Sequence, residues 1–167
     1  MPVLKLLNRA GLQVGETLVD DDVLEWASEH VWRLRRNDNG DRYVSRGVNY
    51  DDLYLHDAIM GQHQGVSVDH INRNGLDNRR CNLRWATRAE QQQNRRTHRN
   101  SKSGVRGVCW NGGSKSWRAS VKKDGRRIWE RRFKNLNDAV IAVADARLKL
   151  FTHATEIDKS ASRLERQ

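Results

Sequence analysis

The feature that most constrains the fold is a pair of alternating segments joined by Asp124-Gly125. Asp-Gly adopts positive φ at little cost and is typical of a two-residue β-hairpin turn. On both sides of this turn, polar and apolar residues alternate with the period of two that a strand requires. We therefore expect antiparallel strands in the segments GVCW, WRASVKK and RRIWERRF of residues 105–133.

A helix is predicted directly after these strands, with Asn135 as its N-terminal cap. Its apolar residues recur at helical spacing and lie on one face; they are Leu136, Ala139, Val140, Val143, Ala144, Leu148 and Phe151. Strand alternation predicts that Trp117, Ala119, Val121 and Ile128 face this helix. The opposite face of the sheet would then carry Arg118, Ser120, Lys122, Arg127, Trp129 and Arg131.

Positive charge is concentrated in one block of the chain. The formal net charge is +10, and the stretch from Arg95 to Lys134 alone contains fourteen Lys or Arg against two acidic residues. Such a block favours a polyanionic partner, nucleic acid before membrane, over a merely solvated basic face. Trp129 among arginines favours a nucleic-acid-binding face over a solvated sheet face. RNA is the weaker candidate, because no exposed aromatic pair typical of single-strand binding is evident.

The N-terminal part predicts a small mixed unit. Three aspartates at 20–22 suit a helix N-terminus, and strands are expected on both sides of the turn at 37–41. A short helix ending at Gly61 follows. The expected core residues are Trp26, Trp32, Leu34, Leu55 and Ile59, while His56 and His63 receive no chemical role.

Residues 66–96 predict a strand, a loop, a second strand and a helix. Thr87 and Glu90 have the spacing of a capping box, which would open the helix. The first strand ends in Asp69-His70, and the loop is rich in asparagine, a residue that suits turns. Taken alone, this pattern also fits an Asp-capped turn beside a structural histidine.

Asp69 and His70 together suit phosphodiester hydrolysis. The ordinary pKa of histidine lies near neutrality, so its ring can take a proton from water. Carboxylate and carboxamide oxygens are ligands for a hard cation such as Mg²⁺. Neighbouring side chains on a strand point in opposite directions, so the two converge only where the backbone bends or the site wraps the strand edge.

The arrangement DHIN-N-LDNRR-NLRWAT within 66–94 resembles the HNH endonucleases of phages and mobile introns, and a weaker likeness extends over 18–96. The resemblance implies a ββα-metal fold with His70 as general base and Asp69 as metal ligand. It also implies that Asn82 orients His70. Arginines that could hold the DNA backbone are Arg79, Arg80, Arg84 and Arg88, although each equally fits a solvated face.

The resemblance implies that a helical residue at position 91 completes the metal site. Gln91 stands where the family has Asn or His, and Asn94, one turn later, is the alternative. The implied cofactor is a divalent metal, Mg²⁺ with Mn²⁺ as the alternative. Cys81 and Cys109 are far apart and form no CxxC motif, so a structural zinc is not expected.

Residues 103–151 resemble the plant ethylene-response-factor (Apetala-type) DNA-binding domain, in which a three-stranded sheet enters the major groove. The resemblance implies DNA contacts by Arg106, Lys122, Arg127 and Trp129, while Cys109 replaces a base-reading arginine. We add Arg118 and Arg131 to the expected contacts because strand alternation places them on the same face.

The predicted fold class is α+β: a ββα-metal HNH unit followed by a three-stranded antiparallel sheet packed on one helix. The predicted domains are 1–93, with the nuclease core at 66–94, a basic linker at 94–104, an Apetala-type domain at 105–155 and a polar tail at 156–167. The predicted function is a phage or mobile-element homing endonuclease, and the alternative is a DNA-binding protein without cleavage. We expect a cytoplasmic protein, in the host if phage-encoded, because neither a secretion signal nor a membrane span is evident. The oligomeric state stays open.

Overall fold

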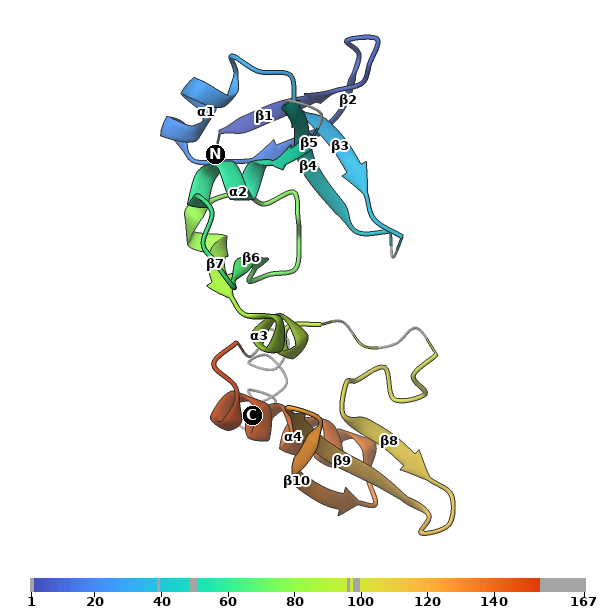
Figure 1. Ribbon diagram of the computed structural model, residues 1–167. Coiled ribbons are helices and arrows are strands. Elements are labelled where there is room, and N and C mark those ends of the chain that lie inside the picture. Colours follow the sequence, from blue (N-terminus) through green and yellow to red (C-terminus); the bar gives the residue numbers. More distant parts are fainter. Residues whose placement is uncertain (1, 39, 49–50, 96, 98–99, 154–167) are drawn as a thin grey trace. The chain divides into compact units, whose positions relative to one another are not determined.

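The computed structural model describes residues 2–38, 40–48, 51–95, 97 and 100–153 (Figure 1). The chain divides into two compact units, residues 1–87 and 88–167, and each is described here by itself. The predicted tail at 156–167, and Arg96, His98 and Arg99 of the predicted linker, lie outside the described residues. The structure is mixed α and β with small antiparallel sheets, as the sequence predicts.

The first unit contains three small antiparallel sheets. Their strands, with the helices between them, are β1 (Val3–Leu7), β2 (Gln13–Leu18), α1 (Asp21–Ala27), β3 (Arg33–Arg36), β4 (Arg42–Val48), β5 (Asp51–Tyr54), α2 (Leu55–Met60), β6 (Ser67–His70), the short 3₁₀ helix η1 (Arg80–Asn82) and β7 (Leu83–Ala86). β1 pairs with β2, β4 lies between β3 and β5, and β6 pairs with β7. The helices and strands expected between residues 20 and 61 are confirmed, whereas β1, β2 and β5 were not predicted.

The core of this unit gathers apolar side chains from β1, α1, β4 and α2 around Trp32. Leu4 and Leu6 alternate with exposed residues in β1, which is the pattern of a strand with one buried face. Trp32 is fully buried, and its indole N–H donates to the carbonyl of Ala27 at 3.0 Å. All five residues predicted for the core are found in it or packed against it.

The second unit begins with α3 (Arg88–Gln93) and continues with β8 (Val108–Asn111), β9 (Ser116–Lys123), β10 (Arg126–Phe133) and α4 (Leu136–Leu150). β9 lies between β8 and β10, and α4 packs on this sheet, as the sequence predicts (Figure 1). Asp124 and Gly125 both adopt positive φ in the hairpin turn. The side chain of Asn135 accepts a hydrogen bond from the amide of Asn137 at 2.8 Å and caps α4.

The prediction for the faces of β10 is wrong at three residues, Ile128, Trp129 and Arg131. The register of β10 shifts between Arg127 and Trp129, so Trp129 lies opposite Val121. Because residues opposite each other share a face, Trp129 packs against the core, while Ile128 is 44% exposed. A β-bulge thus reverses the alternation that the sequence suggested.

The bulge also changes the predicted outer face of the sheet. Arg131 lies opposite Ala119 on the helix side, where it is exposed and its guanidinium lies 6.0 Å from the ring of Trp129. Arg132 lies opposite Arg118 and takes a place on the outer face that the sequence did not assign to it. Arg118, Lys122 and Arg127 keep their predicted places there.

No helix within the described ranges is both long enough and apolar enough to cross a membrane.

Candidate active site

His70 is the last residue of β6 and is buried, with 6% of its surface exposed. In the pairing of β6 with β7, Asp69 lies opposite Arg84 and His70 opposite Leu83. Successive residues of a strand point to opposite faces, so the ring of His70 lies on the other face from the Asp69 carboxylate. The sequence predicts that Asp69 and His70 belong to one site, but their side chains lie on opposite faces of β6.

Asn78 makes a side-chain hydrogen bond to His70. Its Oδ1 lies 3.2 Å from Nε2 of the imidazole. The amide orientation of Asn78 is set by Gly75, whose carbonyl can only accept and receives a hydrogen bond from Nδ2 at 3.2 Å. Oδ1 therefore faces the ring, and Nε2 must donate. The proton of neutral His70 is on Nε2, which puts the basic lone pair on Nδ1.

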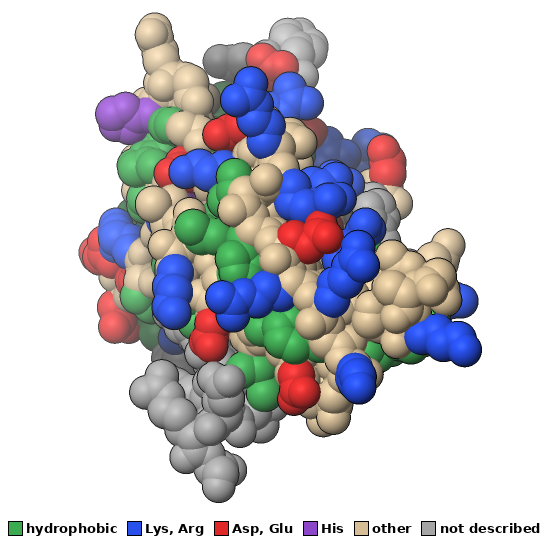
Figure 2. Space-filling model, turned by 90° about the horizontal axis from the view of Figure 1, so that it is seen from below, with side chains coloured by type: hydrophobic (Ala, Val, Ile, Leu, Met, Phe, Trp, Pro, Cys, Tyr) green, Lys and Arg blue, Asp and Glu red, His purple; other side chains and the backbone are tan. Residues whose placement is uncertain are grey.

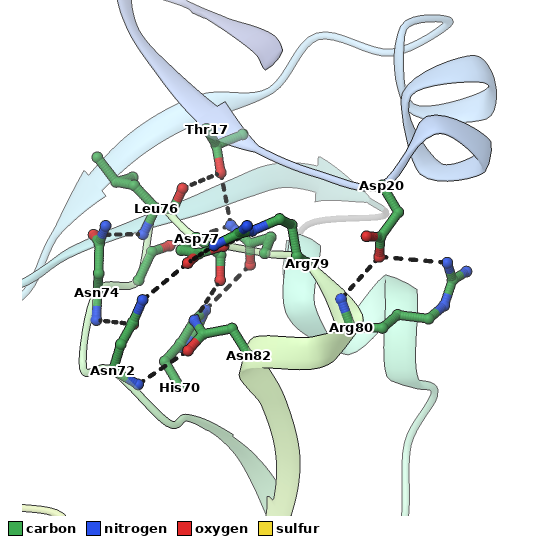
Figure 3. Close-up of polar contacts among 12 residues, drawn as sticks. Thr17, Asp20, His70, Asn72, Asn74, Leu76, Asp77, Arg79, Arg80 and Asn82 are labelled. Carbon is green, nitrogen blue, oxygen red and sulfur yellow. Dashed lines mark hydrogen bonds and ion pairs between the residues drawn. The ribbon is translucent and has the colours of Figure 1, made fainter. Parts of the chain in front are cut away.

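Asn82, which the family resemblance assigns to orienting His70, instead binds the loop backbone. Its Oδ1 accepts from the amide of Asn72 at 3.0 Å, and its Nδ2 donates to the carbonyl of Asp77 at 2.7 Å (Figure 3). Both bonds span the loop between β6 and β7 and fix its width. Asn82 therefore stabilises the loop that carries Asn78, the residue bonded to His70.

A buried carboxylate organises the interior of this loop. Asp77 is 2% exposed; its two oxygens receive bonds from Nε and Nη2 of Arg79, both at 2.7 Å, and Asn72 adds a third bond at 2.9 Å (Figure 3). The contact with Arg79 holds the pKa of Asp77 below its ordinary value, against the opposing effect of burial. The side chains of Asp77 and Arg79 thus stabilise the loop by binding each other.

The loop docks on β2 and on the start of α1. The hydroxyl of Thr17 donates to the carbonyl of Leu76 at 2.9 Å and accepts from Nδ2 of Asn78 at 2.8 Å. Asp20 does not cap α1 through its side chain, although it stands at the N-cap position. Its carboxylate instead accepts from the amide of Arg80 at 2.8 Å (Figure 3). The N-terminal strands thereby support the residue that holds His70.

Position 75 in this loop admits only glycine. A Cβ there would lie 2.2 Å from the carbonyl oxygen of Arg42 and 2.7 Å from Cδ1 of Tyr43. The loop backbone is therefore pressed against β4. Tyr43 is in turn close to His70, with ring centroids 6.1 Å apart.

His56 of α2 lies beside His70, with ring centroids 5.1 Å apart and planes at 85°. Its other side stacks on Tyr54 at 5.3 Å. Burial, and to a lesser extent the neighbouring His70, lowers the pKa of His56 to about 3. This contact was not predicted, because neither the spacing of His56 and His70 nor the residues between them indicate it.

Burial also lowers the pKa of His70 below its ordinary value. The hydrogen bond to Asn78 and the carboxylates of Asp69 and Asp77 act in the opposite direction without reversing it. Both histidines of this pair are therefore neutral at neutral pH. A neutral imidazole is the form that can accept a proton from water.

The carboxylate of Asp69 is bound by Arg84 across the hairpin. Nε and Nη2 of Arg84 lie 2.9 and 2.7 Å from the same oxygen, Oδ2. Among the residues that the structure describes, no group of three or more His, Cys, Asp or Glu side chains is placed to hold a metal ion.

Two of the other arginines proposed near the cut, Arg79 and Arg80, also have acidic partners. Nη1 of Arg80 lies 2.8 Å from Asp22, and Arg79 is bound to Asp77. Arg88 is exposed in α3 of the second unit. Gln91 and Asn94, the two candidates for the further metal ligand, also belong to the second unit: Gln91 lies in α3, and Asn94 follows that helix.

The predicted DNA-binding residues do not share one environment. Lys122 and Arg127 are exposed on the outer face of the sheet, where Arg127 pairs with Glu130 at 2.8 Å. Nη2 of Arg118 on that face lies 3.3 Å from the sulfur of Cys109. Arg106, by contrast, uses Nη1 to bind backbone carbonyls at the end of α3.

Comparisons with known proteins find a match to part of the chain. A family model described as HNH endonuclease matches residues 56–93, a segment that begins at His56 and contains His70, Asn78 and Asn82. Protein 3.8 of Escherichia phage T7 is 33% identical over 64 residues, which are 38% of this chain and 53% of that protein. The chain thus spans about half the length of this relative. No solved structure matches the chain. Residues 56–93 therefore form a segment similar to HNH endonucleases.

Proposed function

We propose that the protein is a metal-dependent endonuclease that hydrolyses phosphodiester bonds in double-stranded DNA. The observation that carries this proposal is the state of His70 within the segment that matches HNH endonucleases. Asn78 holds its ring, and burial keeps it neutral, with the basic lone pair on Nδ1. In the proposed reaction, Nδ1 takes the proton of the attacking water.

Asp69 and Gln91 are proposed to hold the divalent metal, with Asn94 as the alternative to Gln91. A carboxylate and a carboxamide supply hard oxygen donors, which fit Mg²⁺ or Mn²⁺, ions that retain several waters. The bound cation would neutralise charge on the phosphate and on the leaving oxygen. Arg84 already binds Oδ2 of Asp69, so a cation at that oxygen has to share or replace this contact.

The second unit is proposed to bind the DNA duplex through the outer face of its sheet. Arg118, Lys122, Arg127 and Arg132 lie on this face. Lys and Arg side chains spread over the face of the molecule seen in Figure 2, with Asp and Glu among them. The Apetala-type resemblance supports a role in the major groove. The phage relative supports a phage-related protein, while the proposed mobile-element or homing role rests on the resemblance to HNH endonucleases of phages and mobile introns.

The second candidate is a DNA-binding protein without cleavage. The ion pair of Arg84 with Asp69 favours it, because this pair occupies the carboxylate proposed for the metal. Gln91, one methylene longer than the asparagine found in the family, favours it too.

Nicking of supercoiled plasmid separates the two candidates. The endonuclease is expected to convert the plasmid to nicked or linear forms with Mg²⁺ or Mn²⁺ and to stop in EDTA. A folded protein that shifts duplex DNA in a gel yet cuts no plasmid from its source genome with either metal would support binding alone.

A further inference from the structure

Helix α3 is held by the sheet-and-helix part of its own unit through its C-terminal end. The last carbonyls of a helix lack partners within it, and the helix dipole makes that end attractive to cations. Two arginines from separate elements supply donors here: Arg147 of α4, and Arg106, which precedes β8.

Arg147 reaches α3 from inside the unit. It is 5% exposed, and its Nη2 donates to the carbonyl of Gln93 at 2.8 Å. Its guanidinium also lies 5.5 Å from the ring of Phe151. Burial of a guanidinium is costly unless it is well hydrogen-bonded, and an apolar residue would serve plain packing as well. We therefore attribute the presence of arginine at position 147 to its hydrogen bond with the carbonyl of Gln93.

Arg106, which lies between α3 and β8 in the sequence, binds the same end of α3. Its Nη1 donates to the carbonyls of Gln92, Gln93 and Arg95, the last at 3.2 Å. This geometry turns the guanidinium towards backbone carbonyls. Arg106 thus performs a helix-capping task, in contrast to the DNA contact that the Apetala-type resemblance implies.

Residues that follow α4 fix the side chains of α3. The amide of His153 donates to Oε1 of Gln93 at 3.2 Å. The hydroxyl of Thr152 donates to Oε1 of Glu90 at 3.3 Å. A helix as short as α3 is unstable in isolation, so these contacts and the two arginines must supply the stability that its own backbone bonds lack.

We infer that the C-terminal sheet and α4 position α3, with Arg147 and Arg106 as the positioning residues. The functional half of this inference rests on the proposed function, in which Gln91 of α3 is a metal ligand. Arg106 and Arg147 then help to position one proposed metal ligand, Gln91, which belongs to the same unit. Substitution of Arg147 should change the position of Gln91 and leave the residues of the proposed DNA-binding face unchanged.

The test uses the full chain with Arg147→Met, which keeps side-chain bulk and removes the donors. The matched control is Lys149→Met, which removes a positive charge from an exposed position of the same helix. Hydrogen exchange of residues 88–95 is expected to become about tenfold faster in Arg147→Met, the effect of losing one charged hydrogen bond. Exchange in β9 should stay unchanged, and Lys149→Met should alter neither segment.

A cleavage readout tests the functional half. Arg147→Met should raise the Mn²⁺ concentration needed for half-maximal plasmid nicking several-fold, with the Kd for duplex DNA within about twofold of wild type. Arg147→Lys, which keeps a donor and the charge, should recover part of the loss. If Arg147→Met does not fold, Arg106→Met replaces it, because that side chain is outside the core of the unit.

The outcomes are distinct. Unchanged exchange of residues 88–95 in a folded Arg147→Met protein would overturn the positioning of α3. Faster exchange with an unaltered Mn²⁺ requirement would overturn the link to the metal site. If wild type cuts no DNA under any condition, the proposed function fails, and the exchange measurement still decides whether α3 is anchored.

Discussion

Oδ1 of Asn78 lies 3.2 Å from Nε2 of the His70 imidazole, inside a loop that docks on β2. The tautomer of His70 thus depends on the amide of Asn78, which Thr17 and Gly75 orient. A residue 61 positions away from Asn78 in the chain therefore helps to set which nitrogen of the proposed base can accept a proton.

Asn78→Ala is expected to slow DNA cleavage about 10-fold to 100-fold, because His70 loses the partner that fixes its tautomer. The buried groups left without partners should also lower the unfolding free energy by about 1–3 kcal/mol. Cleavage rates at saturating DNA and urea unfolding measure the two effects. Asn74→Ala is the control, since Asn74 is an exposed loop residue outside the contacts of His70. Equal rates in Asn78→Ala and Asn74→Ala would argue against the role of Asn78.

Gly75→Ala is expected to destabilise the protein by about 2 kcal/mol or more, since the new methyl group would overlap the carbonyl of Arg42 and the ring of Tyr43. Gly47→Ala is the matched control, because a Cβ at Gly47 of β4 meets open space. Thermal unfolding compares the two variants. Similar melting temperatures would contradict the tight packing of the loop against β4.

Stability is expected to fall as pH decreases from 6.5 towards about 3, because His56 has a pKa of about 3 when folded and 6.5 when unfolded. Between these values the unfolded chain binds a proton that the folded protein does not, so acid favours unfolding. The loss is on the order of a few kcal/mol, and the lowered pKa of His70 acts with the same sign.

His56→Phe keeps a planar ring against Tyr54 and removes the titration, so it should flatten the dependence of unfolding free energy on pH. Urea unfolding at several pH values measures the slope. If the unfolding free energy depends on pH with the same slope in wild type and in His56→Phe, His56 does not stay neutral in the folded protein.

Lys122→Ala is expected to weaken binding to duplex DNA and to reduce the slope of log K against log salt concentration by about one, as the loss of one phosphate contact predicts. Lys122 is exposed on the outer face of the sheet. Lys149→Ala removes the same charge from α4 and should have a smaller effect. A reversed order of the two variants would place the DNA on another surface of the unit.

The sequence predicts the elements of this fold better than their contacts. The Asp124-Gly125 turn and the Asn135 cap are local, so their residue types were sufficient to locate them. The bulge at Ile128 was not predictable, because a strand can change register without a distinguishing residue. Its consequence is that Trp129 faces the core.

The candidate site shows the same limit. The motif identifies His70, but its asparagines look alike in sequence, and the contact of Asn78 depends on docking against Thr17. His56 was missed because only the packing of α2 against β6 brings it to His70. The roles of Arg106 and Arg147 likewise depend on where α3 ends within its unit.

The most direct test of the central claim is plasmid nicking by His70→Ala beside wild type, with Mg²⁺ or Mn²⁺ and with matched duplex binding. We predict that wild type nicks the plasmid and that His70→Ala is slower by about 10²–10⁴, the usual contribution of a general base, while its Kd for DNA is unchanged. Cleavage by His70→Ala at the wild-type rate would contradict the assignment of His70 as the base.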